Sequence, residues 1–509
     1  MDLNPTISTF EKAYKAGSPQ VVWTTLVADL DTPVSAYLKL VGDNSHAFLM
    51  ESVEAGANRG RYSFVGCRPD IIWKATGNTA ELNRNALNDL DDFSPCPVAA
   101  EHGTLKSLRA LLAESRIDIS PETHGDLPPM SAGLIGYMGY DTVRLSENIP
   151  DTNPDVLNVP DGIFLRATVT AIFDNAKDLM YVVTPVYPSD DLNAEQAFEQ
   201  AQDRLARVVT DFDKALPPEQ SQDDVKDLLD PVSNLSKSAF FDMVERAKKY
   251  ILAGDIFQVV LSQRFKMPFS LPPFSFYRSL RRVNPSPFLF FLDFGDFQVA
   301  GSSPEILVRL RGGQVTIRPI AGTRIRGANA KEDEALKKDL LSDPKERAEH
   351  LMLLDLGRND IGRVSKVGSI NVTESYKVEL YSHVMHIVSN VIGEIQDDKD
   401  ALDALYAGFP AGTVSGAPKV RAMEIIDELE PEKRGIYAGC IGYFGADGEM
   451  DTCIALRTAV IKDGMLYAQA GGGIVMDSTP QGEYDESCNK ARALIRAAEE
   501  AVRFARHKN

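Results

Sequence analysis

The amino-acid sequence predicts an α+β fold in which helices cover antiparallel sheets. Strand-like segments occur next to one another with tight turns between them, which favours antiparallel pairing. Helical patterns lie in separate segments among these strands and at the C-terminus. Strands mixed with separate helices are typical of helices packed on the faces of antiparallel sheets.

The expected strands are recognised by the turns between them. Gly312-Gly313, Asp447-Gly448 and Asp463-Gly464 each separate two β-rich segments, and Asp-Gly is a favoured two-residue hairpin turn. The strands expected on this basis are, in chain order, residues 171–174, 180–185, 306–310, 314–317, 438–444, 452–461 and 465–470.

Apolar residues recur at helical spacing in four segments. These segments are residues 238–253, 343–356, 419–429 and 480–503. Two of them begin with a cap residue followed by proline, at Asp343-Pro344 and Thr479-Pro480. Proline suits the first helical position because the N–H that it lacks would have no partner there.

A polar and acidic stretch divides the sequence. Residues 216–236 open with Leu-Pro-Pro and are rich in Asp, Ser and Gln, which is typical of an exposed connection. The sequence therefore predicts an N-terminal domain at residues 1–215, this linker, and a C-terminal domain at residues 237–509.

The charge balance argues against nucleic-acid and membrane partners. The chain has 54 Lys and Arg against 73 Asp and Glu, a formal net charge of −19, and so acidic a surface repels phosphates and anionic membranes. The five cysteines are scattered without a CxxC pair, which fits a reducing compartment. No signal peptide or apolar run of membrane-helix length occurs. We expect a cytoplasmic protein.

Two pairs of glutamates repeat one spacing near helix starts. Glu346 and Glu349 are three residues apart on one helix face, and so are Glu483 and Glu486. Acidic residues near a helix N-terminus are common because they complement the helix dipole. Two matching pairs would also suit Mg²⁺, which prefers a few carboxylates together with water or substrate oxygens. The spacing alone leaves both interpretations open.

An arginine and a run of glycines indicate an anion site in the last hairpin. If residues 452–461 form one strand, Arg457 shares a face with alanines and a cysteine. Its guanidinium then points into a cavity, where it can bind a carboxylate through two hydrogen bonds, or makes a structural salt bridge. Gly471-Gly472-Gly473 on the next strand can offer N–H groups to an anion, although a bulge is the commoner reason for such a run.

A glycine-containing loop and two histidines complete the candidates. Residues 409–419 (FPAGTVSGAPK) precede a helix and can bind an anion at its N-terminus. They do not form a nucleotide-binding P-loop, because Lys419 does not follow a glycine and Val420 replaces Ser or Thr. His383 and His386 lie in one apolar segment, where histidine is more often structural than catalytic.

Taken in order, these motifs resemble those of the chorismate-utilising enzymes. The matching segments are 301–305 (GSSPE), 318–324 (RPIAGTR), 346–360 (ERAEHLMLLDLGRND), 409–419, 470–474 and 483–490. The resemblance covers about the whole of residues 238–503, and co-linear motifs of this kind are specific. It implies large antiparallel sheets packed as a sandwich-like core with helices on the outside.

Two residues within the resemblance indicate which nucleophile attacks chorismate. Relatives that add water have a lysine base at the position of Gln258, and glutamine cannot act as that base. Relatives that form aminodeoxychorismate have a lysine nucleophile at the position of Ala321, and alanine offers no covalent route. The resemblance therefore implies direct attack by ammonia, followed by loss of pyruvate to give anthranilate.

The resemblance also assigns roles to individual residues. Glu305 matches the general acid at the departing hydroxyl, and His386 matches the histidine that assists the acid–base steps. The residues that would bind chorismate are Thr413, Tyr437, Arg457, Gly471 and Gly473. The ligands of Mg²⁺, which would act as a Lewis acid, would be Glu346, Glu349, Glu483 and Glu486.

A second site is implied for tryptophan as a feedback inhibitor. Residues 49–52 (LMES) are similar to the family's tryptophan-binding motif, with Met50 in place of one leucine. The residues that would form this site are Glu51, Ser52, Pro287, Phe288, Leu289, Tyr443 and Cys453. Met50 and Leu289 depart from the residues that relatives often have, but both changes conserve volume. A plain core role for residues 49–50 is the alternative.

The resemblance further implies a partner protein. The chain carries no segment with a glutaminase cysteine nucleophile, so we expect a separate glutamine amidotransferase subunit to deliver ammonia, and hence a hetero-oligomer, unless free ammonia serves. Aminodeoxychorismate synthase, isochorismate or salicylate synthase, and an inactive tryptophan-binding regulator are the alternatives. The intact glutamate pairs, His386 and Arg457 argue against the inactive regulator.

Overall fold

The structure is a computed structural model of the 509-residue chain. It describes residues 1–42, 44–54, 58–119, 124–125, 127–216, 229–381 and 384–506. Most of the predicted linker, at residues 217–228, and His383 lie outside these ranges. Among the described helices, none is long and apolar enough to cross a membrane.

One β-sheet links 22 strands of the described chain and draws on both halves of the sequence. Strand β2 (Ala47–Glu51) pairs with β13 (Phe288–Asp293), and β8 (Gly133–Met138) pairs with β21 (Cys440–Gly445), both antiparallel. Strands that precede the predicted linker therefore pair directly with strands that follow it. The N-terminal and C-terminal halves of the sequence share one sheet.

The remaining strands confirm the predicted hairpins. Hairpins β15–β16, β21–β22 and β23–β24 turn at the three predicted dipeptides. The other strands of the sheet are β1 (Gln20–Val27), β5 (Tyr62–Thr76), β6 (Thr79–Asn83), β7 (Ser94–Pro95), β9 (Gly162–Asp174), β10 (Leu179–Val186), β11 (Val232–Ser233), β12 (Gln258–Pro268), β14 (Phe297–Ser303), β15 (Ile306–Arg311), β16 (Gln314–Ile317), β17 (Ile320–Ile325), β18 (Asn371–Leu380), β19 (Val384–Glu394), β20 (Gly416–Ala417), β22 (Met450–Ile454), β23 (Thr458–Lys462) and β24 (Met465–Ile474). Strands β3 (Val53–Glu54) and β4 (Asn58–Arg59) pair separately.

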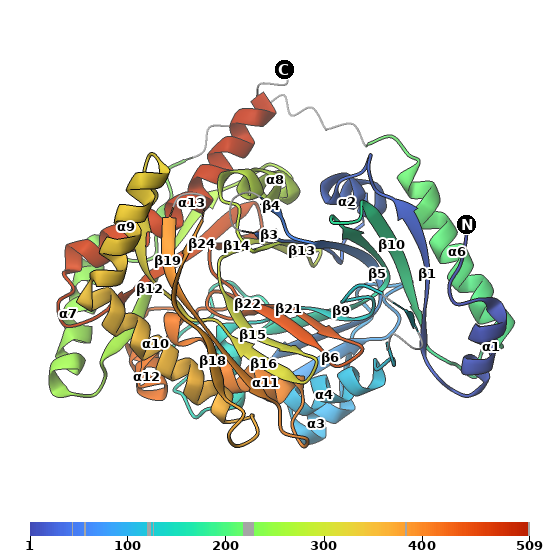
Figure 1. Cartoon of the computed structure of the whole chain (residues 1–509), viewed down its shortest axis with the longest axis horizontal. Coiled ribbons are helices and arrows are strands. Elements are labelled where there is room, and N and C mark those ends of the chain that lie inside the picture. The colour runs from blue at the N-terminus through green and yellow to red at the C-terminus, as the bar shows by residue number, and fades with distance from the viewer. Residues whose placement is uncertain are drawn as a thin grey trace.

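Helices lie around the outside of the strands (Figure 1). They are α1 (Ile7–Lys15), α2 (Pro33–Val41), α3 (Pro97–His102), α4 (Thr104–Glu114), α6 (Ala194–Phe212), α7 (Lys237–Ala253), α8 (Pro273–Val283), α9 (Ala330–Ser342), α10 (Pro344–Gly362), α11 (Ala401–Gly408), α12 (Lys419–Leu429) and α13 (Pro480–Arg506), with 3₁₀ turns η1 (Tyr140–Leu145) and η2 (Gly412–Val414). Helix α10 begins as predicted, because the Asp343 side chain accepts hydrogen bonds from the N–H groups of Lys345 and Glu346. The predicted α+β class is confirmed.

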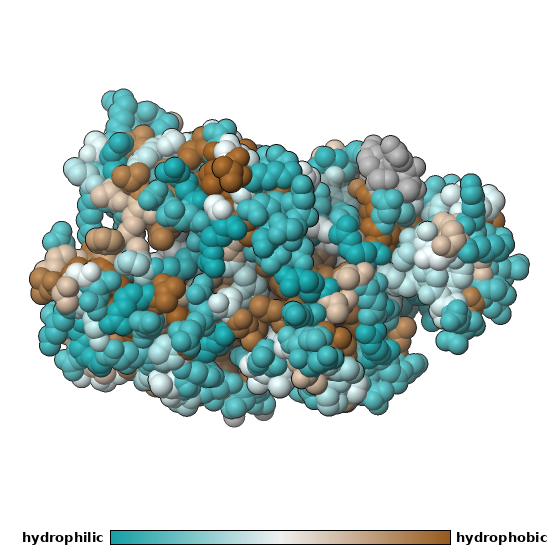
Figure 2. All heavy atoms as spheres, turned by 90° about the horizontal axis from the view of Figure 1, so that it is seen from below, coloured by the Kyte–Doolittle hydropathy of each residue, from teal (hydrophilic) through white to brown (hydrophobic). Residues whose placement is uncertain are grey.

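Both halves contribute to one apolar core. The ring of Phe164 lies 6.0 Å from that of Trp73 and 5.4 Å from that of Phe444, measured between ring centroids. These aromatic contacts join strands β5 and β9 to β21, and the same cluster includes Ile425 of α12. On the face drawn in Figure 2, hydrophilic residues predominate and apolar residues gather only in small groups. Most apolar side chains are thus buried between the sheet and its helices.

The single strand predicted at residues 452–461 is wrong. Strand β22 ends at Ile454 and β23 begins at Thr458. Strand β22 pairs with β21 and β15, whereas β23 pairs with β14 and β24. The chain therefore changes partners at residues 455–457, and the break in pairing places Arg457 outside the alternation from which its direction was predicted.

Candidate active site

Arg457 occupies the break between strands β22 and β23. Its backbone φ is +48°, a left-handed conformation that is uncommon for residues with a Cβ. Burial lowers the pKa of its guanidinium, and no carboxylate of the described residues forms an ion pair with it. The structural salt bridge that the sequence left open is therefore not found among these residues. A half-buried cation that lacks a carboxylate partner in this way is suited to binding an anion.

Glu305 lies between β14 and β15 and is almost completely buried, with 6% of its surface exposed. Burial raises the pKa of its carboxyl group to about 8. The Thr413 hydroxyl donates a hydrogen bond to Glu305 Oε1 at 3.3 Å, so η2 and the β14–β15 connection meet at this carboxyl. Because its pKa lies above neutrality, Glu305 carries a proton at pH 7, as its predicted role as general acid requires.

His386 lies on β19 and is neutral at physiological pH. Burial lowers its pKa to about 4, and the positive charge of Arg457 contributes to this shift. Nδ1 lies 3.0 Å from the Gly322 carbonyl oxygen. Since a carbonyl oxygen only accepts, Nδ1 carries the hydrogen and the lone pair is on Nε2. The predicted acid–base residue is therefore an unprotonated imidazole held in one tautomer.

The glycines of β24 are required by the close approach of β12. A Cβ added at Gly471 would lie 2.3 Å from the Leu261 carbonyl oxygen, and one at Gly473 would lie 2.2 Å from Gln258 Nε2. Of the Gln258 amide, Oε1 is buried without a hydrogen-bond partner among the described residues. The Tyr437 hydroxyl lies within hydrogen-bonding reach of the Gly471 backbone N–H. Because Gly471 and Gly473 have no side chains, β12 can lie close to β24 and the Tyr437 hydroxyl can approach the β24 backbone.

The two glutamate pairs lie close enough to influence one another. Burial raises the pKa of Glu349, and the charges of Glu346 and Glu486 raise it further. Burial likewise raises the pKa of Glu483, and Glu486 again contributes. Helices α10 and α13, far apart in the sequence, thus bring their carboxylates to one region. Sequence spacing could not show this meeting.

The glutamates do not form a closed metal cage in this structure. Within the described residues, no group of three or more His, Cys, Asp or Glu side chains is arranged to hold an ion. Glu346 accepts a hydrogen bond from Arg324 at 2.9 Å, and Glu486 accepts one from Lys490 at 2.8 Å. Glu483 Oε2, by contrast, is buried without a partner among the described residues.

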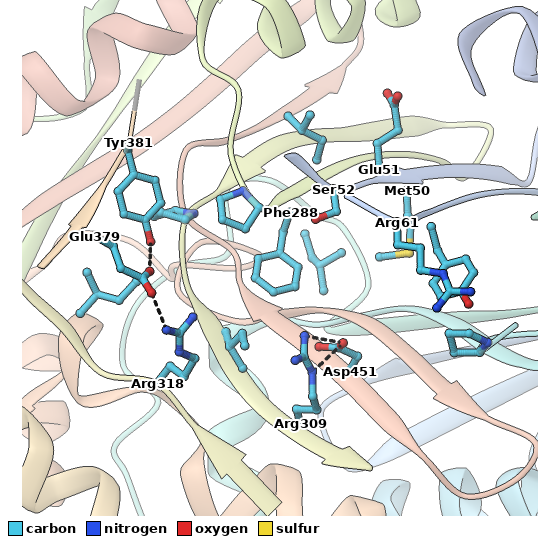
Figure 3. A pocket seen from close by; sticks show the side chains of 18 of the residues that line it. Met50, Glu51, Ser52, Arg61, Phe288, Arg309, Arg318, Glu379, Tyr381 and Asp451 are labelled. Atoms are coloured by element: carbon cyan, nitrogen blue, oxygen red, sulfur yellow. Dashed lines mark hydrogen bonds and ion pairs between the residues drawn. The ribbon is translucent and has the colours of Figure 1, made fainter. Parts of the chain in front are cut away.

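A cavity with a volume of about 1040 Å³ is lined by residues other than these four glutamates. Of the residues predicted to bind tryptophan, those that line it are Glu51, Ser52, Pro287, Phe288, Leu289 and Tyr443. Cys453 does not line it and is 1% exposed in the apolar core. Figure 3 shows Met50, Ser52 and Arg61 on one side of this cavity, with Glu379 and Tyr381 on the other.

Glu51 is already satisfied by internal partners. Its carboxylate accepts two hydrogen bonds from Arg281, at 2.7 and 2.9 Å, and one from the Tyr277 hydroxyl at 2.6 Å. These contacts tie β2 to α8 beside the cavity. Glu51 therefore shapes the cavity wall, and its charge is neutralised within the protein.

Sequence reasoning missed several side chains that organise these sites. Tyr381 lines the cavity, and its ring lies 5.3 Å from that of His386. Arg324 and Lys490 hold two of the four glutamates. Only Lys490 had a readable signal, because it follows Glu486 by four residues on one helix. Arg324 and Tyr381 contact residues of other strands or helices, and sequence spacing does not predict such contacts.

Comparisons with known proteins agree with this architecture. Residues 62–496 match the family described as chorismate binding enzyme. The chain is 57% identical to anthranilate synthase component 1 of Cereibacter sphaeroides over 498 residues, which cover 98% of each chain. It is 45% identical to anthranilate synthase component 1 of Pseudomonas aeruginosa, covering 94% of this chain and 95% of the relative.

Solved structures show the same fold. Anthranilate synthase component I from Streptococcus pneumoniae TIGR4 matches with a TM-score of 0.74 and 39% identity, covering 92% of this chain and 98% of that chain. MenF, the menaquinone-specific isochorismate synthase from Escherichia coli, has a TM-score of 0.69 at 19% identity and covers 97% of this chain and 99% of its own. By its sequence and its fold, the chain belongs to the chorismate-binding enzyme family.

Proposed function

We propose that the chain has anthranilate synthase activity and converts chorismate and ammonia to anthranilate and pyruvate. The high identity to relatives that bear this name supports the proposal. The observation that carries it in the structure is Arg457, a half-buried, partly desolvated cation without a carboxylate partner among the described residues. Chorismate is a dicarboxylate and supplies the missing charge. Its enolpyruvyl carboxylate binds Arg457, and the Tyr437 hydroxyl donates a further hydrogen bond.

The neighbouring groups supply the proton transfers. Ammonia attacks C2 of chorismate, the ring double bonds shift, and the C4 hydroxyl leaves as water with the proton of Glu305. The ammonium group formed at C2 then loses one proton, which restores the protonated Glu305. The adduct then loses the C2 proton to a base, and the C3–O bond breaks to release enolpyruvate, which takes up a proton to become pyruvate. His386 Nε2, with its lone pair free, is the base that the geometry favours.

Gln258 supports ammonia as the nucleophile. Its buried Oε1 has no hydrogen-bond partner among the described residues, and an amide oxygen accepts an N–H without removing a proton. Ammonia needs such an acceptor for orientation, but it needs no base because its lone pair is already free. A separate glutamine amidotransferase subunit supplies this ammonia in the proposal.

The proposal includes Mg²⁺, held by Glu346, Glu349, Glu483 and Glu486. The unpartnered oxygen of Glu483 and the raised pKa of Glu349 fit such an ion, because buried carboxylates that repel one another are stabilised by a divalent cation. When bound, Mg²⁺ supplies Lewis-acid neutralisation of the ring carboxylate. Arg324 and Lys490 keep two of these carboxylates oriented.

Glu486→Gln tests the metal assignment. We expect the Mg²⁺ concentration for half-maximal turnover to rise at least about tenfold, because an amide oxygen is neutral and a weaker ligand for a hard cation. Glu500→Gln, on the same helix and paired with Arg503, is the matched control and should titrate as wild type. An unchanged Mg²⁺ titration and turnover in Glu486→Gln would remove this residue from the metal site.

One assay tests the reaction itself. Chorismate, Mg²⁺ and ammonium at alkaline pH should give anthranilate and pyruvate in equal amounts. Replacing ammonium by glutamine should give no product until a glutaminase subunit is added. Formation of aminodeoxychorismate or isochorismate, or no turnover with ammonium, would overturn the proposed function.

The large cavity supports a regulatory site for tryptophan in this proposal. Phe288 and Tyr443 offer aromatic surface to an indole, and Ser52 offers a hydroxyl. Tyr381 lines the same cavity and contacts His386, so a ligand that displaces this ring changes the surroundings of the acid–base histidine. Inhibition then acts through two conformations with different affinity for the effector.

Ser52→Phe tests this site. The larger ring occupies cavity volume, so we expect the tryptophan concentration for half-inhibition to rise about tenfold or more while kcat without tryptophan is unchanged. Ser94→Phe, on the exposed strand β7, is the control and should keep wild-type inhibition. Wild-type activity that is unaffected by millimolar tryptophan would contradict the effector assignment.

A further inference from the structure

A buried ion pair lies behind the candidate active site, in the segment that follows α12. Glu430 is 4% and Arg434 is 2% exposed. The guanidinium binds the carboxylate through two hydrogen bonds, Nε to Oε2 at 2.9 Å and Nη2 to Oε1 at 2.7 Å. Such a paired fork fixes the orientation of both groups more strictly than a single contact does.

The remaining N–H groups of Arg434 bind two backbone segments of the site. Nη1 donates to the Val414 carbonyl oxygen and Nη2 donates to the Val260 carbonyl oxygen, both at 2.7 Å. Val414 follows Thr413 directly, and Val260 lies opposite Gly473 in the pairing of β12 with β24. One guanidinium therefore connects η2 to the strand that faces the glycine run.

The same ion pair also lies close to Tyr437 and to the strand residue opposite Gly471. The guanidinium carbon lies 5.6 Å from the centre of the Tyr437 ring and 4.6 Å from that of Tyr140, within the range of a cation–π contact. Glu430 Oε1 also accepts hydrogen bonds from the N–H and the hydroxyl of Ser262, both at 2.8 Å. Ser262 lies opposite Gly471.

We propose that the Glu430–Arg434 pair is a positioning element for chorismate binding. The ion pair fixes the relative positions of four of the five predicted chorismate contacts, namely Thr413, Tyr437, Gly471 and Gly473. The fifth predicted contact is Arg457. Nε, Nη1 and Nη2 of Arg434 already bind Glu430 and two backbone carbonyl oxygens, so Arg434 acts on substrate binding through these neighbours. A buried ion pair contributes little net stability by itself, because the cost of desolvation offsets the attraction, so its effect is expected in the geometry of the site. This inference rests on the proposed chorismate site.

Arg434→Lys tests the proposal. Lysine keeps the charge beside Glu430 but cannot bind the carboxylate and two carbonyl oxygens in one plane. We expect the KM for chorismate to rise about 10–100-fold, the range seen when a supporting contact of a ligand-binding group is lost, with a smaller effect on kcat. The control is Arg166→Lys. Arg166 on β9 is also buried, with 7% of its surface exposed, and binds Asp70 on β5 through two hydrogen bonds, at 2.7 and 2.9 Å. This variant should lose stability without a change in KM.

The outcomes distinguish positioning from a purely structural role. A folded Arg434→Lys chain with wild-type KM, or with only the stability loss of Arg166→Lys, overturns the inference. If Arg434→Lys does not fold, Ser262→Ala removes one contact of Glu430 and should raise KM, whereas Ser107→Ala, which removes a buried serine bonded to Trp73, should not. A wild-type KM in Ser262→Ala then overturns the inference. Wild-type protein that forms no anthranilate overturns the proposed function as well.

Discussion

Glu305→Gln is expected to lower kcat by about 10²–10⁴-fold, the usual contribution of a general acid. Glutamine has the shape of the protonated carboxyl group and accepts the Thr413 hydrogen bond, so the chain should fold as wild type. It has no proton to give to the departing hydroxyl. Steady-state assays at saturating chorismate and ammonia measure this loss. Glu449→Gln is the control, because burial also raises the pKa of Glu449 but this residue lies in the β21–β22 hairpin.

The pH dependence provides an independent check of the same residue. Because the pKa of Glu305 is about 8, the carboxyl group is protonated at neutral pH and ionises above it. Wild-type kcat, corrected for the fraction of ammonia, should therefore fall as pH rises through about 8. The residual activity of Glu305→Gln should lack this decline. A decline of equal size in both proteins would assign it to another group.

Stability should follow the same titration with a defined sign. A carboxyl group whose pKa is raised on folding stabilises the protein below its unfolded pKa, and this contribution is lost as pH rises through its folded pKa. For Glu305 the loss is complete once pH exceeds about 8. The free energy of unfolding, measured with urea, should therefore decrease between neutral and alkaline pH in wild type and decrease less in Glu305→Gln.

The parts of the fold that the sequence predicted are those governed by local rules. Asp447-Gly448 and Asp463-Gly464 specify hairpin turns through their own conformational preferences, and Pro344 marks the start of α10. The break at residues 455–457 was missed because it has no local cause. It arises where β22 and β23 take different partners, which only the assembled sheet determines.

The candidate site shows the same division. Motif order predicted roles for Glu305, His386 and both glutamate pairs, but not the burial that raises the pKa of Glu305 and lowers that of His386. Arg434 was missed although it follows Glu430 by four residues. That spacing predicts an ordinary surface pair on a helix, whereas the chain leaves the helix at Glu430 and buries both groups. The burial of these side chains and the groups around them depend on the assembled fold, which the spacing of residues in the sequence does not reveal.

Arg457→Met is expected to weaken chorismate binding and yet leave the protein at least as stable as wild type. A hydrogen bond between charged groups contributes about 1.5–3 kcal/mol, so its loss should raise the KM for chorismate by about 10–100-fold. The stability expectation follows from burial, which disfavours the charged guanidinium and lowers its pKa in the folded chain. Methionine fills similar space without that desolvation cost.

Arg166→Met gives the opposite pattern and makes the comparison decisive. Removing Arg166 leaves the half-buried Asp70 without the guanidinium that now donates two hydrogen bonds to it, so this variant should lose stability. Its KM for chorismate should stay at the wild-type value because Arg166 binds Asp70, Ser115 and Tyr187, none of which is a predicted chorismate contact. If Arg457→Met instead lost stability as Arg166→Met does and kept its KM, Arg457 would be a structural cation. If Arg457→Met is more stable than wild type and binds chorismate more weakly, Arg457 serves substrate binding. The protein then keeps this charge for the carboxylate of the substrate although the charge lowers its folding stability.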